Sequence, residues 1–238
     1  MASKVRLFVD HPLGEGQTVP LDRDRATYLF AVMRLGVGCV LTLINGRDGA
    51  WDAVVVEGSK RGGTLRVQAQ TAPQIAPPDL WLMCAPIKKA RMDFVVEKAV
   101  ELGAARILPV VTDYTNEKVR TDKLQAHAIE AAEQCGGTFV PPVAEVARLG
   151  AVLDGWGDRR ILFCDESLVG AAANLAALTP GPWAVLIGPE GGFSPAERDR
   201  LQVMPQAQAI SLGPRILRAD TAAVAAMTLW QVTLGDWR

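Results

Sequence analysis

The segment Leu186-Ile-Gly-Pro-Glu-Gly-Gly-Phe-Ser-Pro-Ala-Glu197 decides how the second half of this chain is interpreted. An apolar run typical of a buried strand opens into glycines, which permit positive φ angles and a close backbone approach. Ser194 as N-cap, Pro195 at the first helical position and Glu197 three residues after the cap then match a capping box. The segment therefore predicts a strand, a tight loop and a helix start in direct succession.

A second segment, Ser211-Leu-Gly-Pro-Arg-Ile-Leu-Arg-Ala-Asp-Thr-Ala-Ala223, repeats this order nearer the C-terminus. It predicts a strand end, a Gly-Pro loop and a helix with Asp220 or Thr221 as its cap. Arg215 and Arg218 flank two apolar residues of the loop, which favours an anionic or hydrogen-bonding partner for both. Neither segment has the glycine pattern of dinucleotide sites or P-loops, so phosphate is disfavoured as the ligand. Plain strand-to-helix turns with solvated arginines are the structural alternative.

Short apolar runs alternate with helical patterns from Leu80 onward, as in an α/β domain with a mainly parallel sheet. The predicted strands are residues 80–85, 106–110, 160–164, 183–187 and 207–212. The predicted helices are residues 121–135, 195–203 and 220–234, and one ending at Gly103 in which Met92, Val95, Val96, Ala99 and Leu102 share a face. Ligands of such sheets bind just past the carboxyl ends of strands, which is where both loops lie.

The first 70 residues alternate in the manner of a small antiparallel β module. Residues 40–45 and 52–57 flank a Gly46-Arg-Asp-Gly49 turn. In a further expected strand, one face is formed by Leu65, Val67 and Ala69. Three prolines in residues 71–79 favour an extended connector. The predicted organisation is a β domain at residues 1–72, a linker at 73–79 and an α/β domain at 80–238.

Composition narrows the classes of function. A length of 238 residues with 49% hydrophobic residues fits a folded protein of one or two domains. With a net charge of −1, affinity for RNA must come from local patches. His11 and His127 lie far from the glycine-rich segments, which disfavours a histidine-centred hydrolase or metal site. The spacing of the four cysteines matches neither a zinc knuckle nor a redox pair. Without a signal-like or membrane-spanning stretch, a cytoplasmic location is expected.

The last predicted helix has almost no polar face between Ala222 and Leu234. Such a helix is expected to be buried on several sides. It is either a central packing helix of the monomer or part of a twofold dimer contact, and composition does not choose between them.

Taken together, the two loop segments resemble the RsmE family of ribosomal RNA methyltransferases. The resemblance spans the whole chain and includes Val32-Met-Arg-Leu-Gly36, Lys88, Met92, Glu97-Lys-Ala-Val-Glu-Leu-Gly103, Ala131-Ala-Glu-Gln-Cys-Gly136 and Leu234-Gly-Asp-Trp237. It implies a SPOUT-type α/β domain tied in a trefoil knot and preceded by a PUA-like, RNA-binding β-barrel. The implied reaction transfers a methyl group from S-adenosylmethionine to N3 of a uridine in 16S rRNA of the small ribosomal subunit. The implied enzyme is a homodimer and uses no metal.

The resemblance also implies site residues. Those expected to bind the cofactor are Leu186, Ile187, Gly188, Pro189, Glu190, Gly191, Gly192, Leu212, Gly213, Arg215, Ile216, Leu217, Thr221 and Ala222. Arg218, with Arg215 as second choice, is expected to stabilise the negative charge that develops when uracil N3 loses its proton. Asp220 or Glu190 is the candidate acceptor of that proton. RNA contacts are expected from Arg23, Arg25, Arg34, Lys88, Lys89, Arg91, Lys118, Arg120 and Lys123.

At three positions this chain lacks a polar or basic side chain that is usual in the family. Tyr28 stands where histidine is usual, Tyr114 where arginine is usual, and Gly137 where arginine is common. Asp220 stands where the family has glutamate. Both cofactor loops keep the family's pattern, so methyl transfer is still expected. The departures leave open which nucleotide is methylated. A SPOUT methyltransferase acting on another rRNA or tRNA position, and a non-catalytic RNA-binding module, remain the alternatives.

Overall fold

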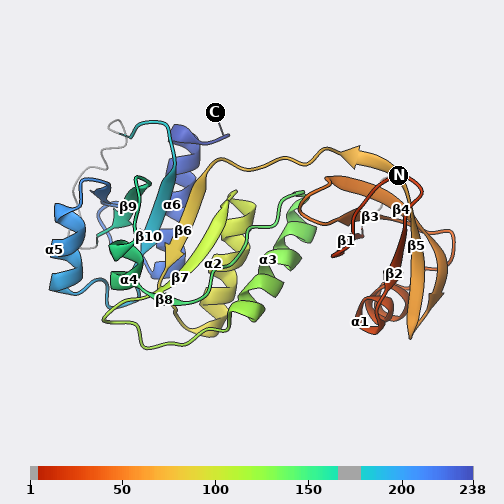
Figure 1. Cartoon of the computed structure of the whole chain (residues 1–238). Coiled ribbons are helices and arrows are strands. Elements are labelled where there is room, and N and C mark those ends of the chain that lie inside the picture. Colours follow the sequence, from red (N-terminus) through yellow and green to blue (C-terminus); the bar gives the residue numbers. More distant parts are fainter. Residues whose placement is uncertain (1–4, 166–177, 238) are drawn as a thin grey trace. The chain divides into compact units, whose positions relative to one another are not determined.

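The computed structural model describes residues 5–165 and 178–237, which form two compact units, each with its own sheet (Figure 1). Unit 1 holds the chain up to Ala76 together with Ala132–Val140, and unit 2 holds Pro77–Ala131 and the chain from Pro141 onward. Among the described helices, none combines the length and apolar character that a membrane span requires.

Unit 1 is built on a five-stranded sheet with the order β1-β3-β4-β5-β2. Only β1 and β3 pair in parallel, so the predicted antiparallel β module is confirmed for the other pairs. The strands are β1 (Arg6–Phe8), β2 (Thr18–Leu21), β3 (Val40–Ile44), β4 (Ala50–Ser59) and β5 (Gly62–Ala72). Between β2 and β3 lie the short helix α1 (Arg23–Ala26) and a π-helix, η1 (Thr27–Val32). Alternate apolar residues of the strands form the core of the unit.

The prediction of a single face for β5 is wrong at Ala69. Leu65 and Val67 are buried, whereas Ala69 is exposed. Val67 pairs with Ala53 and Ala69 pairs with Asp52, so Gln68 is an extra residue opposite β4. Such a bulge exchanges the two faces of a strand beyond it, because side chains alternate with a period of two.

Unit 2 is built on a six-stranded sheet with the order β11-β9-β10-β6-β7-β8, in which all neighbours are parallel. The strands are β6 (Leu80–Cys84), β7 (Arg106–Val111), β8 (Ala147–Arg148), β9 (Arg160–Cys164), β10 (Trp183–Ile187) and β11 (Ala207–Ile210). Every residue of β10 is buried, as is typical of a strand covered on both faces. The predicted α/β domain with a mainly parallel sheet is confirmed, and the knot stays a prediction.

Helices cover both faces of this sheet (Figure 1). They are α2 (Lys89–Glu101), α3 (Thr121–Cys135), α4 (Leu149–Asp154), α5 (Pro195–Val203) and α6 (Ala219–Leu234). On one face, α4 and α5 join a core cluster with Met83, Phe163 and Leu186. On the other, α6 packs against β10 and α2. Gly103 has a φ of 73° just after α2, which confirms the predicted helix end.

Within one chain, α6 is buried along one side. The buried residues are Ala219, Ala222, Ala223, Ala226, Met227, Trp230 and Gln231. Gln231 is fully buried, and its Nε2 donates to the Leu102 carbonyl at 2.6 Å. The opposite side of the helix remains accessible, and Val232 on it is 56% exposed. Packing inside the monomer therefore accounts for one side of this apolar helix and not for the other.

Candidate functional site

A hollow lies between two loops at the carboxyl edge of the unit 2 sheet. Because β9 lies between β10 and β11, the loops that follow β10 and β11 meet above the end of β9. This first hollow encloses about 810 Å³ that protein atoms do not fill, part of it open to solvent. The structure thus brings the two loop segments together.

Most of the residues expected to bind the cofactor line the first hollow. They are Ile187, Gly188, Pro189, Glu190, Gly192, Leu212, Gly213, Arg215, Ile216, Leu217 and Ala222, and Arg218 lines it as well. Three expected residues do not line it. Leu186 is buried in the core cluster beneath α5, Gly191 borders a neighbouring hollow, and Thr221 is exposed on α6.

The sequence did not identify the contribution of β9. Cys164 and Asp165, at its carboxyl end, line the first hollow, as do Ile210, Ser211 and Ala219. Asp165 is buried, and its Oδ1 lies 3.2 Å from Nε of Arg198 on α5. Burial raises the pKa of the Cys164 thiol to about 12. The sequence did place both residues at the end of a predicted strand. Only the strand order, however, shows that this strand ends between the two loops.

The loop after β10 is held by the capping box of α5, which is confirmed. The Glu197 amide donates to Ser194 Oγ at 3.2 Å, and the Ser194 amide donates to Glu197 Oε2 at 2.9 Å. Glu197 Oε1 also accepts the Asp113 amide at 2.9 Å, while Ser194 Oγ donates to Asp113 Oδ2 at 2.5 Å. Gly192 closes the turn, with a φ of 67° and its amide bonded to the Pro189 carbonyl. The same two side chains therefore anchor the loop after β10 and the loop after β7.

At the start of α6, the prediction that Asp220 or Thr221 caps the helix is wrong. Arg218 is the N-cap, without a side-chain capping bond, because its extended backbone directly precedes the first helical residue. Asp220 lies in the first turn instead, where a negative charge is favourable near the helix N-terminus. Its Oδ1 accepts the Thr221 amide at 2.9 Å.

Two arginines bring positive charge to the first hollow. Arg215 and Arg218 both line it and are exposed. In the described part of the chain, no carboxylate forms an ion pair with either guanidinium, since the ion pairs around the site belong to Arg91 and Arg198. Both are therefore available to an anionic ligand or substrate.

Arg91 of α2 lies between the two candidate proton acceptors. Its Nη1 is 3.9 Å from Glu190 Oε1, and its Nε is 3.9 Å from Asp220 Oδ2. Arg91, which the sequence predicted to contact RNA, therefore lies close to two acidic side chains of unit 2. Glu190 lines the first hollow, whereas Asp220 is not among the lining residues. Glu190 is therefore better placed to meet a substrate there.

The other expected RNA contacts fall into two groups. Arg25 pairs with Asp22 and Lys89 with Asp93, each at 2.5 Å, and Arg120 pairs with Asp122 at 2.6 Å. In the described chain, no such ion pair engages the exposed residues Arg23, Arg34, Lys88, Lys118 and Lys123.

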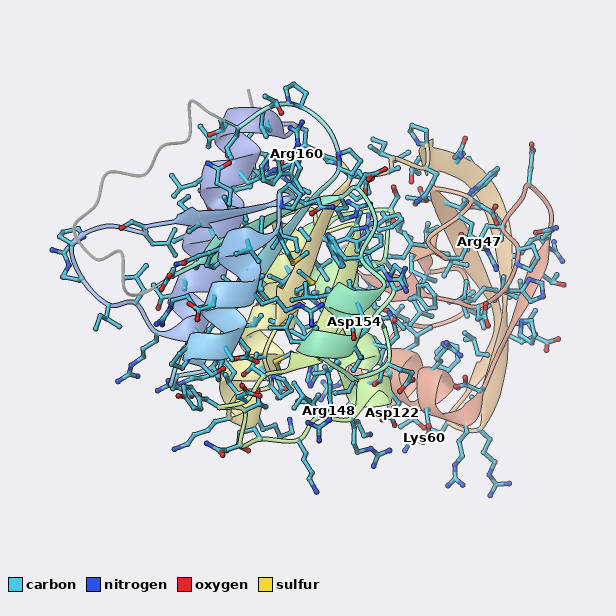
Figure 2. The ribbon with its side chains drawn as sticks, turned by 60° about the vertical axis from the view of Figure 1, so that its left-hand side comes forward. Arg47, Lys60, Asp122, Arg148, Asp154 and Arg160 are labelled. Carbon is cyan, nitrogen blue, oxygen red and sulfur yellow. The ribbon has the colours of Figure 1, made fainter. Side chains whose placement is uncertain are left out.

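Lys60 is a further cation of unit 1, which the sequence did not single out. Figure 2 shows it at the end of β4 opposite to Arg47. The hydroxyl of Thr27 donates to the Lys60 carbonyl at 3.2 Å, so Lys60 lies at the same end of the unit as α1 and η1. Arg23 of α1 and Lys60 therefore place two cations at that end.

A second hollow borders the first at Glu190. It is lined by Lys88, Asp113, Tyr114, Asn116, Glu117, Glu190 and Gly191. One of the three departures from the family's pattern, Tyr114, is therefore part of this wall. In the part of the chain that the structure describes, no cluster of His, Cys, Asp or Glu could hold a metal ion.

Comparison with protein-family models gives two matches. The model of an RNA methyltransferase domain matches residues 75–231, and that of an RNA methyltransferase PUA domain matches residues 21–68. The first match covers both loops and both hollows.

Individual proteins are similar over nearly the whole chain. "Ribosomal RNA small subunit methyltransferase E" of Rickettsia conorii is 29% identical over 93% of this chain and 93% of its own length. The crystal structure of the Neisseria gonorrhoeae protein of that name, bound to S-adenosyl methionine, is 28% identical with a TM-score of 0.87, covering 98% of this chain and 99% of that one. A Legionella pneumophila methyltransferase structure in complex with SAM is also 28% identical, with a TM-score of 0.88 and 98% of both chains covered.

Proposed function

Because this chain belongs to the RNA methyltransferase domain family, we propose that it methylates N3 of a uridine in 16S rRNA of the small ribosomal subunit, with S-adenosylmethionine as donor. The similar proteins named ribosomal RNA small subunit methyltransferase E, and the two similar structures that hold S-adenosylmethionine, support this assignment. The observation that carries it is the meeting of the loops after β10 and β11 around one hollow.

The residues of the first hollow fit an adenosyl sulfonium compound. Backbone groups of the two loops offer hydrogen bonds to an adenine edge, and Ile187, Ile216 and Leu217 form an apolar wall. The buried carboxylate of Asp165, which is paired with Arg198, completes the lining at the end of β9. When bound, S-adenosylmethionine supplies an electrophilic methyl group on its sulfonium sulfur.

The chain's own residues place the reactants, because transfer of a methyl group in line requires alignment more than covalent participation. The guanidinium of Arg218 lies at the first hollow, where it stabilises negative charge on the uracil oxygens. A carboxylate oxygen of Glu190 holds the proton that leaves N3, with Asp220 as the second candidate. Arg91 keeps both acids in place between the two loops.

Exposed cations bind the phosphates of the RNA. In unit 1 these are Arg23, Arg34 and Lys60, and in unit 2 they are Lys88, Lys118 and Lys123. Arg25, Lys89 and Arg91 contribute less, because acids of the same chain already neutralise them. A nearly neutral protein thereby gains RNA affinity from local positive charge.

The protein acts as a homodimer in the cytoplasm, where its ribosomal substrate is found. The accessible apolar side of α6, with Val232 on it, supports a contact between two copies. Burial of this side across a twofold axis also explains why the sequence of α6 has almost no polar face.

The test uses small ribosomal subunits from cells that lack this protein. Purified protein and S-adenosylmethionine are added, and the modified nucleoside is identified and mapped by mass spectrometry. N3-methyluridine at a single 16S position is expected; another product or another RNA overturns the assignment. Calorimetry with S-adenosylmethionine distinguishes the enzyme from a non-catalytic RNA-binding module, for which no saturable binding is expected.

A further inference from the structure

The second hollow is built by the loop after β7, which the α5 capping box holds in place. Glu197 accepts the Asp113 amide and Ser194 donates to the Asp113 carboxylate, as described above. The Thr112 amide donates to Thr115 Oγ1 at 2.9 Å, which closes the loop on itself. Tyr114 therefore projects from a loop that is bonded to the start of α5 at Asp113 and closed on itself between Thr112 and Thr115.

Tyr114 forms one wall of this hollow and approaches the loop after β10 closely. A Cβ atom on Gly191 would lie 3.4 Å from the Tyr114 Cβ, which is ordinary contact distance, so the tyrosine lies directly beside this loop. Tyr114 nevertheless remains 45% exposed, which leaves part of its ring free for a ligand. Every nucleobase has a face that stacks on such a ring.

The charges of the second hollow select against phosphate. Three carboxylates, those of Asp113, Glu117 and Glu190, line it with a single ammonium group, that of Lys88. Arg91 does not line the hollow, and its guanidinium lies 3.9 Å from Glu190, so the acidic groups still outnumber the cations. A phosphate would be repelled, whereas the N–H edge of a neutral base would find acceptors. The side-chain amide of Asn116 adds a donor for a ring carbonyl oxygen.

We propose that the second hollow receives the pyrimidine base of the substrate nucleotide, with its ring stacked on Tyr114 and its N–H edge toward Glu190. The two hollows share Glu190, so a base held here borders the ligand of the first hollow. The assignment rests on the proposed function and adds the location at which the substrate base is recognised.

The kinetic test compares Tyr114→Ala with Tyr114→Phe in the methylation of unmodified small subunits. Loss of one base-stacking contact raises KM for the subunit, or lowers kcat/KM, by roughly 5- to 150-fold. Tyr114→Phe keeps the ring and is expected to stay within about threefold of wild type. Phe94→Ala is the matched control, because Phe94 is a similarly exposed aromatic (40%) that lines neither hollow.

Two further measurements separate recognition of the base from folding. The affinity for S-adenosylmethionine, measured by calorimetry, is expected to be the same in all three variants. Subunits from cells grown with 4-thiouridine are also irradiated with the wild-type protein, and the crosslinked peptide is expected to contain residues 113–117.

The outcomes distinguish this assignment from the function on which it rests. A wild-type protein that forms no N3-methyluridine overturns both. If wild type is active but Tyr114→Ala has unchanged kinetics, or if crosslinks fall only outside residues 113–117, the base-binding assignment alone is wrong. A loss of S-adenosylmethionine binding in Tyr114→Ala also contradicts it, because the tyrosine would then act on the first hollow.

Discussion

At the scale of single residues, Arg218 stands out because its guanidinium lines the first hollow and no ion pair with a described carboxylate neutralises it. We expect Arg218→Ala to lower kcat by about 100-fold or more, which is typical when one group that stabilises developing negative charge is removed. Arg218→Lys should restore part of the rate, since it returns the charge without the planar fork. Single-turnover methylation of small subunits measures both.

Arg215→Ala is the comparison for this prediction, because Arg215 lines the same hollow from the same loop. The expected loss there is smaller than for Arg218. Calorimetry should give an unchanged affinity of Arg218→Ala for S-adenosylmethionine. An Arg218→Ala protein that binds the cofactor and methylates at the normal rate would remove Arg218 from the reaction.

Substitutions of Glu190 and Asp220 are expected to have different effects, because of these two acids only Glu190 lines the hollows. We expect Glu190→Gln to lower kcat by about 100-fold or more, as for loss of a general base, and Asp220→Asn to lower it less than about tenfold. The Glu190→Gln rate should recover at alkaline pH, where uridine N3 ionises without help. The pH–rate profiles of the two variants decide the matter, and the reverse order of effects would assign the proton to Asp220.

The cysteines give a prediction about pH. Burial raises the pKa of both Cys84 and Cys164 to about 12, whereas Cys135 is exposed. A raised thiol pKa keeps the neutral form up to high pH, so these thiols are poor nucleophiles at pH 8. Iodoacetamide should therefore modify Cys135 first, and Cys164 only at a rate that rises about tenfold per pH unit. Mass spectrometry of the labelled peptides measures the rate of modification at each cysteine. Comparable rates for Cys135 and Cys164 at pH 8 would contradict the prediction.

The same shift has a consequence for stability. Because the folded pKa lies above that of the free thiol, the stabilising contribution of the neutral thiols is complete below about pH 9. It is lost as the pH rises through the folded value of about 12. Unfolding midpoints should therefore fall on the alkaline side, and Cys84→Ala should reduce that pH dependence.

At the scale of elements, the sequence predicted those helix and strand boundaries that interactions between neighbouring residues determine. The capping box at Ser194 and Glu197 fixed the start of α5, and the apolar run at residues 183–187 gave β10. The cap of α6 was wrongly predicted at Asp220 or Thr221, because Arg218 occupies the N-cap position and makes no side-chain capping bond. Asp165 was missed because the order β11-β9-β10 depends on strand pairing between distant segments, which no local pattern encodes.

Gln231 tests the packing of α6 on α2. It is fully buried and its amide donates to the carbonyl of Leu102, which follows the last turn of α2. Gln231→Leu leaves that carbonyl without its donor, so we expect a loss of about 1 to 3 kcal/mol in the free energy of unfolding. Denaturant unfolding measures the loss. Gln68→Leu, at an exposed position on β5, should change it by less than about 0.5 kcal/mol.

At the scale of the whole molecule, a net charge of −1 has to be reconciled with an RNA substrate. Ion pairs within the chain neutralise several cations that the sequence presents as equivalent, such as Arg25 and Lys89. Arg23 and Arg25 of α1 cannot be ranked from sequence alone, because ion pairing is a property of the fold. The structure therefore separates the basic residues that are paired with acids of the chain from those whose charge is available to RNA phosphates.

The homodimer is tested on the accessible side of α6. Val232 is 56% exposed, so Val232→Lys should change the stability of a single chain by no more than about 0.5 kcal/mol. If two copies meet on this side, the substitution buries like charges near a twofold axis and dissociates the dimer. Sedimentation velocity should then show a monomer for Val232→Lys and a dimer for wild type. Val203→Lys, at an 80% exposed valine that ends α5, should stay dimeric, and a dimeric Val232→Lys would exclude this side of α6 from the contact.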